Sequence, residues 1–126
     1  MTVLKSGPDA ISIAADAGVT ICYGSDLLTG THKFQRREFT LRSQVQTPLE
    51  ILRSATTNCA RMLRMEDKIG QVKEGFLADL IILRTNPLDD ITTLDDKDNL
   101  LAVVKDGHVS FSTLPELGDT TERNTW

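Results

Sequence analysis

The chain has 126 residues and a formal net charge of −4, a size that suits one domain or part of a larger protein. The acidic balance gives no basic patch, so nucleic acid is not an expected partner, and no apolar run approaches the roughly 20 residues that a membrane helix needs. The first residues carry no apolar signal core, and the two cysteines make no disulfide framework, so we expect a reducing, cytoplasmic location.

The first predicted elements are a helix and a buried strand that leads to an aspartate. Ser6 and Pro8 form a helix-start signal, apolar residues follow at helical spacing, and Gly18 is the expected helix end. Residues 19–23 are apolar or β-branched on both faces, which is typical of a parallel strand that is covered on both sides. A short turn then leads to Asp26, so the sequence predicts an αβ unit that presents a carboxylate.

Residues 32–45 are predicted to form a two-sided helix. Its apolar side chains are expected to pack inward, and the arginines and the glutamine on the other face are expected to be solvated. The inward residues are Phe34, Leu41 and Val45, and the solvated ones are Arg36, Arg37, Arg42 and Gln44.

The clearest local signal is the helix start at residues 47–50. Thr47 caps the helix, Pro48 takes the first helical position, and Glu50 completes a capping box. Residues 56–58 interrupt this helix because their side chains compete for backbone hydrogen bonds. Either Thr57 or Asn58 is expected to cap a second, short helix. The side chains predicted to be buried on the two helices are Leu49, Leu52, Ala55, Cys59, Met62 and Leu63.

From residue 68 onwards the pattern changes to short strands and turns. Gly75 occupies a turn position that is expected to need a positive φ, and Asp106 and Gly107 give the strongest two-residue hairpin signal. The strands are predicted at residues 69–72, 80–83, 101–105 and 108–111. The chain therefore divides into an α/β region (1–65), a β-rich region (66–115) and a flexible tail (116–126).

The cysteines and histidines have different expected environments. Cys22 and Cys59 lie inside apolar patterns, so we interpret both as small buried hydrophobic residues rather than as catalytic thiols. His108 follows the hairpin turn and is predicted to face solvent. His32 follows Asp26 in the next loop, where it is either a residue that lines a substrate pocket or a surface residue at a helix start.

The predicted strands do not make a closed sheet. Residues 19–23 form a single parallel strand with no partner in the α/β region, and the few strands after residue 66 have open edges. Strands are therefore expected to be missing from this chain or to come from another chain, which leaves a homo-oligomer open.

Several motifs, in order and at matching spacing, resemble the C-terminal portion of the amidohydrolase superfamily. The similarity is greatest to its imidazolonepropionase-like and Xaa-Pro-dipeptidase-like members, and it covers roughly residues 10–112. The motifs are the segments 18–26, 47–60, 70–83, 86–88 and 103–109.

The resemblance implies a metal-dependent hydrolase of C–N bonds, built on a (β/α)8 (TIM) barrel with a small β-sandwich domain. Residues 19–23 would be the last barrel strand, 32–64 the helices after it, and 68–112 the C-terminal share of the sandwich. Asp26 would contact the divalent metal, expected to be one or two zinc ions in the complete protein, and would act as general base and then general acid. His32 would be the candidate for binding the small amide or peptide substrate.

The other metal ligands of that family have no counterpart in this sequence. It contains no His-x-His, and a catalytic metal site needs at least three protein ligands, so no metal is predicted for this chain alone. Three interpretations remain open: part of an active hydrolase, a truncated and inactive remnant or interaction domain, and a freestanding α+β binding module. Asp26 could also simply cap the turn that follows it.

Overall fold

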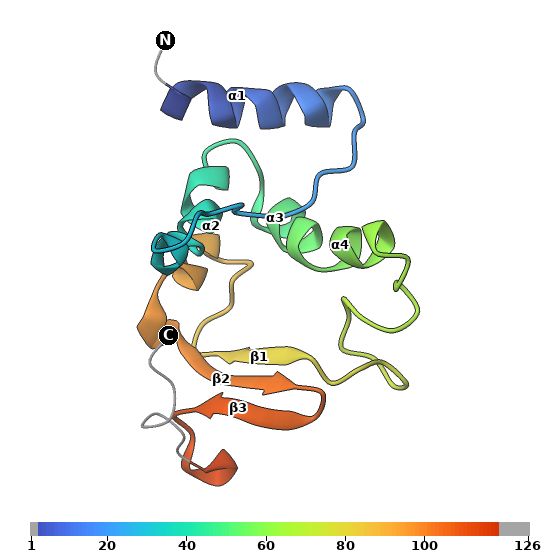
Figure 1. The fold of residues 1–126 in the computed structure, drawn as a ribbon, viewed down its shortest axis with the longest axis vertical. Helices are drawn as coiled ribbons and strands as arrows, with labels where there is room; N and C mark the ends of the chain where they lie inside the picture. Colours follow the sequence, from blue (N-terminus) through green and yellow to red (C-terminus); the bar gives the residue numbers. More distant parts are fainter. Residues whose placement is uncertain (1–2, 119–126) are drawn as a thin grey trace.

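Helices and a small sheet form three tiers in the computed structural model, which describes residues 3–118 (Figure 1). Helix α1 (Val3–Asp16) makes the first tier, and the middle tier contains α2 (Arg37–Arg42), α3 (Pro48–Ala55) and α4 (Thr57–Met62). The sheet contains β1 (Leu80–Leu83), β2 (Leu100–Lys105) and β3 (His108–Ser112). Short 3-10 helices complete the described residues: η1 (His32–Phe34), η2 (Ile91–Leu94), η3 (Lys97–Asn99) and η4 (Pro115–Leu117). The expected mixture of helix and strand is confirmed.

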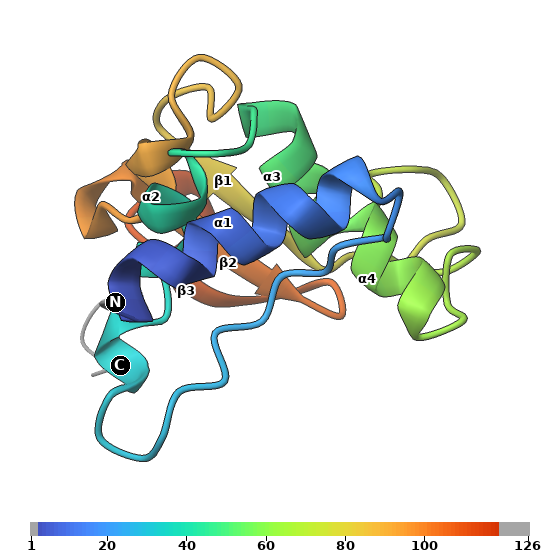
Figure 2. The ribbon, with the colours of Figure 1, turned by 90° about the horizontal axis from the view of Figure 1, so that it is seen from above.

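Helix α1 begins earlier than the sequence predicts and takes Pro8 into its interior rather than into its first turn. Its end is as predicted, because Gly18 adopts a φ of 72° and its N–H donates to the carbonyl of Ala15. The helix lies across the other helices with Ile13 still 69% exposed, so it adds little to the core (Figure 2).

The predicted strand at residues 19–23 is wrong for this chain. The segment has no strand ladder, because the three-stranded sheet of the described residues is formed entirely by residues after 79. A strand needs a neighbour to receive its backbone hydrogen bonds, and a pattern in the sequence cannot supply one. Side chains from the helices provide several of those bonds instead.

The predicted helix at 32–45 is divided into η1 and α2, and its inward face is not the predicted one. Leu41 and Phe34 are exposed, whereas Arg42 is only 6% exposed. The prediction that Arg42 is solvated is therefore wrong, and the reason is the set of polar partners described below. Phe39, from the same helix, packs against the core.

The capping box at the start of α3 is confirmed. The Thr47 N–H donates to Glu50 Oε2 (2.7 Å), and the Glu50 N–H donates to Thr47 Oγ1 (3.3 Å). The break before α4 is also confirmed, but Thr56 occupies the N-cap position rather than Thr57 or Asn58. The buried residues on α3 and α4 are Ile51, Ser54 and Ala60; Leu52, Ala55 and Cys59 are half-buried, and Leu49, Met62 and Leu63 are exposed, against prediction.

One small core joins the helices to the sheet. Ile51 of α3 packs with residues of η2, and partly buried side chains from α2, α3 and β1 surround them. The cluster consists of Ile51, Ile91 and Leu94, with Phe39, Leu52 and Leu83 packed against it. Because this core is small, much apolar surface stays exposed elsewhere on the described residues.

The sheet is antiparallel with the order β1-β2-β3. Its hairpin is confirmed, because Asp106 and Gly107 both have positive φ (50° and 74°), as the two-residue hairpin turn requires. The Asp106 N–H also donates to Asp79 Oδ1 (2.7 Å), which fixes the turn against the chain that enters β1.

The segment between α4 and β1 folds as turns. The strand predicted at 69–72 is wrong: Gly70 has a φ of 86° and lies against Thr56 and Ala60 of the α3–α4 region. The positive φ predicted for Gly75 is confirmed at 84°. The predicted tail, residues 116–126, lies mostly outside the described residues.

Candidate functional site

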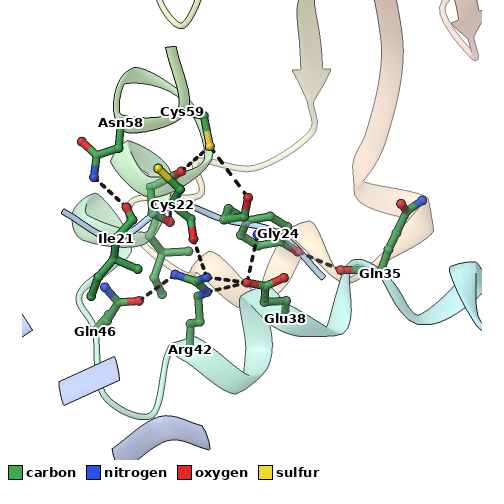
Figure 3. A network of polar contacts seen from close by, with 12 residues as sticks. Ile21, Cys22, Gly24, Gln35, Glu38, Arg42, Gln46, Asn58 and Cys59 are labelled. Carbon is green, nitrogen blue, oxygen red and sulfur yellow. Dashed lines mark hydrogen bonds and ion pairs between the residues drawn. The ribbon is translucent and has the colours of Figure 1, made fainter. Parts of the chain in front are cut away.

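Residues 19–26, here called the Asp26 segment, are held by contacts from the helices of the middle tier (Figure 3). The Tyr23 N–H donates to the Ser54 carbonyl of α3 (2.9 Å). The Asn58 side-chain amide of α4 donates to the Ile21 carbonyl (2.9 Å). These bonds satisfy groups that a strand would satisfy with its neighbours, so the segment stays extended without a ladder.

The strongest contact comes from an ion pair on α2. Arg42 Nη2 donates to the Cys22 carbonyl (2.9 Å), and its Nε donates to Glu38 Oε1 (2.7 Å). The same Glu38 oxygen accepts from the Gly24 N–H (3.4 Å). Both side chains are largely buried, at 7% and 15% exposure, so solvent screens this pair little. The pair therefore fixes the backbone on both sides of Tyr23.

Tyr23 anchors the middle of the segment. Its ring stacks on Phe39 with a centroid distance of 4.4 Å, and its hydroxyl donates to the Gln35 carbonyl (2.8 Å). Burial, with the nearby Glu38 charge as a smaller cause, raises the pKa of the Tyr23 hydroxyl well above its usual range. Tyr23 is therefore a neutral hydrogen-bond donor at every physiological pH.

Asp26 lies just beyond this braced stretch. It is exposed, and its backbone adopts a φ of 44°, in the left-handed region that non-glycine residues occupy uncommonly. Its carboxylate has no hydrogen-bond or ion-pair partner among residues 7–118, so it does not cap the turn that follows. The structure thus presents a free carboxylate at the end of a fixed segment.

The loop after Asp26 carries His32. The Nε2–H of His32 donates to the Leu27 carbonyl (3.2 Å), which leaves Nδ1 as the unprotonated nitrogen of the neutral ring. His32 is exposed and begins η1, which agrees with a residue at a helix start. A substrate-binding role for His32 stays a prediction. His108 is exposed on β3, as predicted.

No three His, Cys, Asp or Glu side chains within the described part of the chain are grouped to hold a metal ion. Asp26 and His32 come from one loop and would supply too few ligands by themselves. Two surface hollows have lining residues that fall between 57 and 71 and between 71 and 80, so neither hollow includes Asp26 or His32. Among residues 3–118, no helix has the length and apolar character to cross a membrane.

The residues that fix the segment were not singled out from the sequence as site residues. Glu38 and Arg42 did offer a signal, since they are spaced as an i,i+4 ion pair on a predicted helix. Asn58 gave none beyond its preference for helix starts. Cys22 and Cys59 are half-buried rather than buried, and the two thiols lie close together (Figure 3).

The sequence of this chain matches the model of a known family. The model of the amidohydrolase family matches residues 2–110, so the chain belongs to the amidohydrolase family. The resemblance inferred from the sequence motifs is confirmed.

The chain is similar to several particular members of this family. The ochratoxinase of Aspergillus niger is 35% identical over 95 residues, which are 75% of this chain and 20% of that protein. A prolidase crystallised with N-methylphosphonate-L-proline superposes with a TM-score of 0.78 and 40% identity, over 82% of this chain and 26% of the prolidase. A Xaa-Pro dipeptidase with methionine in its active site gives a TM-score of 0.71 and 36% identity, over 81% of this chain and 25% of the dipeptidase. The chain spans about a quarter, or less, of the length of these relatives.

Proposed function

We propose that this chain supplies Asp26 to the hydrolytic centre of an enzyme that cleaves amide or dipeptide bonds. The observation that carries the proposal is the unpartnered Asp26 carboxylate, with a φ of 44°, at the end of a segment fixed by buried side chains. Backbone strain of this kind is often found at functional sites. The similarity to a prolidase and to a Xaa-Pro dipeptidase supports a substrate with a C–N bond of the peptide type.

The chemistry needs a carboxylate that is free to exchange a proton. In amide hydrolysis a water oxygen attacks the carbonyl carbon, and the amine leaves only after its nitrogen has gained a proton. An Asp26 carboxylate would accept the proton from the attacking water and then donate it to the departing nitrogen. A side chain already held by a strong partner would serve less well, and Asp26 has none among the described residues.

The rest of the proposed centre lies outside this chain's described residues. Residues 19–23 would form the last strand of a (β/α)8 barrel, and residues 66–115 would be a share of a β-sandwich. The described residues do not by themselves fit a catalytic metal, because no three potential ligands are grouped among them. Asp26 is the one residue that we propose as a metal ligand, with zinc as the expected metal, and His32 is proposed to contact the substrate.

The test is a chimera in which the matched quarter of the Xaa-Pro dipeptidase is replaced by this chain. We expect the chimera to hydrolyse Xaa-Pro dipeptides, and Asp26→Asn to lower kcat by about 10²–10⁴-fold with a smaller change in KM. Asp89→Asn is the matched control, since Asp89 is also exposed but lies in the loop before η2. A folded chimera in which Asp26→Asn is as active as Asp89→Asn would refute the role of Asp26.

A further inference from the structure

The thiol of Cys22, in the Asp26 segment, lies near the thiol of Cys59, which is far away in the sequence. Cys59 Sγ, on α4, lies 3.0 Å from the Ser54 carbonyl and 3.8 Å from the carbonyl of Tyr23, the residue that follows Cys22. The Cys22 side chain lies on the same side of the segment as Cys59, and Figure 3 shows the two labelled thiols near each other. Both cysteines are free and half-buried.

The surroundings of this pair allow the sulfurs to join. A disulfide needs an S–S distance of about 2 Å and adjacent Cβ atoms, so one element has to shift slightly. Because the Asp26 segment is held by contacts from the helices rather than by a sheet ladder, a small adjustment at Cys22 breaks no strand pairing. Half-exposure lets a small reagent reach the thiols, whereas a pair locked in a rigid core would be inert.

We infer that Cys22 and Cys59 form a redox-sensitive pair, which a low-molecular-weight disulfide such as glutathione disulfide converts into an intramolecular disulfide. One protein thiolate attacks the reagent's S–S bond, and one small thiol leaves. The second protein thiolate then attacks the mixed disulfide, the Cys22–Cys59 bond forms, and a second small thiol leaves. The two protons of the protein thiols end on the two small thiols. This inference is independent of the proposed hydrolytic function.

The surroundings of the pair shift the pKa of the Cys22 thiol. Burial, and then the neighbouring Cys59, raise the pKa of the Cys22 thiol, while the guanidinium groups of Arg42 and Arg61 oppose this increase. Because the thiolate is the attacking species, the raised pKa of the Cys22 thiol means that disulfide formation becomes faster as the pH rises.

The test uses the 126-residue chain with glutathione disulfide in native buffer, followed by intact mass and tryptic mapping. Trypsin cleavage at lysine and arginine places the two cysteines in peptides 6–33 and 54–61. The expected product is a monomer that has lost the mass of two hydrogen atoms and yields these two peptides linked. A chain that stops at the mixed disulfide, or links only to other chains, would overturn the inference.

Cys22→Ser and Cys59→Ser are the matched controls, because each keeps one thiol at nearly constant volume. Each variant is expected to stop at a mixed disulfide and to keep the added mass of one glutathione. A second comparison measures ring closure in urea, where the two thiols meet only by chance. We expect native closure to be faster by about tenfold or more. Equal rates in buffer and urea would show that the fold does not pair the thiols.

Discussion

Replacing Arg42 with methionine tests whether the α2 ion pair holds the Asp26 segment. Methionine keeps most of the volume of the arginine stem but removes the guanidinium group, which donates to the Cys22 carbonyl and to Glu38. The Glu38 carboxylate would then be left largely buried without its counter-charge. Its Oε2 already has no hydrogen-bond partner among the described residues.

The expected loss of stability follows from that uncompensated charge. Removing one partner of a buried ion pair costs about 3–5 kcal/mol, and Glu38 keeps 15% exposure, so we expect the lower end of this range. The carbonyl of Cys22 loses a donor as well, which adds about 1 kcal/mol. The double variant Glu38→Gln/Arg42→Met contains no unpaired buried charge, because the Glu38 carboxylate is replaced by a neutral amide. It should therefore be more stable than Arg42→Met alone by about 1–2 kcal/mol.

Urea unfolding followed by circular dichroism measures these differences, with an unchanged slope as the check that the unfolding transition stays comparable. Arg53→Met is the matched control: Arg53 is an exposed arginine on α3, and its replacement should change stability by less than about 0.5 kcal/mol. The reasoning fails if Arg42→Met behaves like Arg53→Met, or if the double variant is no more stable than Arg42→Met.

The remaining predictions concern single positions. Gly70→Ala should destabilise the fold by about 2–3 kcal/mol, because the φ of Gly70 is 86° and an added Cβ would lie 2.9 Å from the Ala60 Cβ of α4. Gly75→Ala should cost only about 1 kcal/mol, because Gly75 has a similar φ of 84° but open space around it. Equal losses of stability for the two variants in urea unfolding would contradict this. Tyr23 is the only tyrosine, and its folded pKa is raised above the unfolded value near 10. The stability that the neutral Tyr23 hydroxyl contributes is therefore complete below about pH 10 and is lost as the pH rises further. The ultraviolet signal of tyrosinate should then appear only when the chain unfolds. A reversible titration with a midpoint near pH 10 in the folded chain would refute the buried environment of Tyr23. Thr47→Ala should destabilise by about 1 kcal/mol, measured by thermal unfolding. In the parent chain the Thr47 backbone N–H, and then its hydroxyl, lower the pKa of Glu50, so the capping stability should be present above about pH 5 and be lost in acid. Thr47→Ala keeps the backbone bond and loses the hydroxyl, so the difference between parent and variant should narrow in acid by the hydroxyl's share; a difference that widens in acid would argue against the cap.

Local chemistry explains which parts of the fold could be predicted from the sequence. The capping box at Thr47 and the hairpin at Asp106 and Gly107 depend on a few adjacent residues, and both form as expected. Burial was predicted poorly, as at Met62, because the side of a short helix that is covered depends on neighbours that periodicity does not specify. Arg42 shows the same limit, since one of its partners, the Cys22 carbonyl, lies 20 residues away in the sequence and a solvated arginine was the simpler expectation.

The candidate site could also be predicted only in part from the sequence. The position of Asp26 at the end of an apolar run could be predicted from the order of the residues, and so could the loop that carries His32. The contacts that hold the residues before Asp26 could not be predicted, because they run from the helices to backbone groups of the segment. A strand prediction assumes that these groups bond to other strands, and here side chains take their place.

The free backbone groups of the Asp26 segment give a direct test of its proposed place in a barrel. The Tyr23 N–H has a partner in the Ser54 carbonyl, but the Ile21 N–H has none among the described residues. In the chain alone, the Ile21 amide should therefore exchange with solvent at close to the unprotected rate, and the Tyr23 amide should exchange more slowly.

A central barrel strand would change this pattern, because its N–H groups donate alternately to the two neighbouring strands. In the Xaa-Pro dipeptidase chimera we expect the Ile21 amide to become protected by at least about tenfold, measured by residue-resolved hydrogen exchange. An active chimera whose Ile21 amide stays unprotected would contradict the strand assignment and leave the role of Asp26 standing. An inactive, folded chimera with a protected Ile21 would do the reverse, so the two parts of the proposal can fail separately.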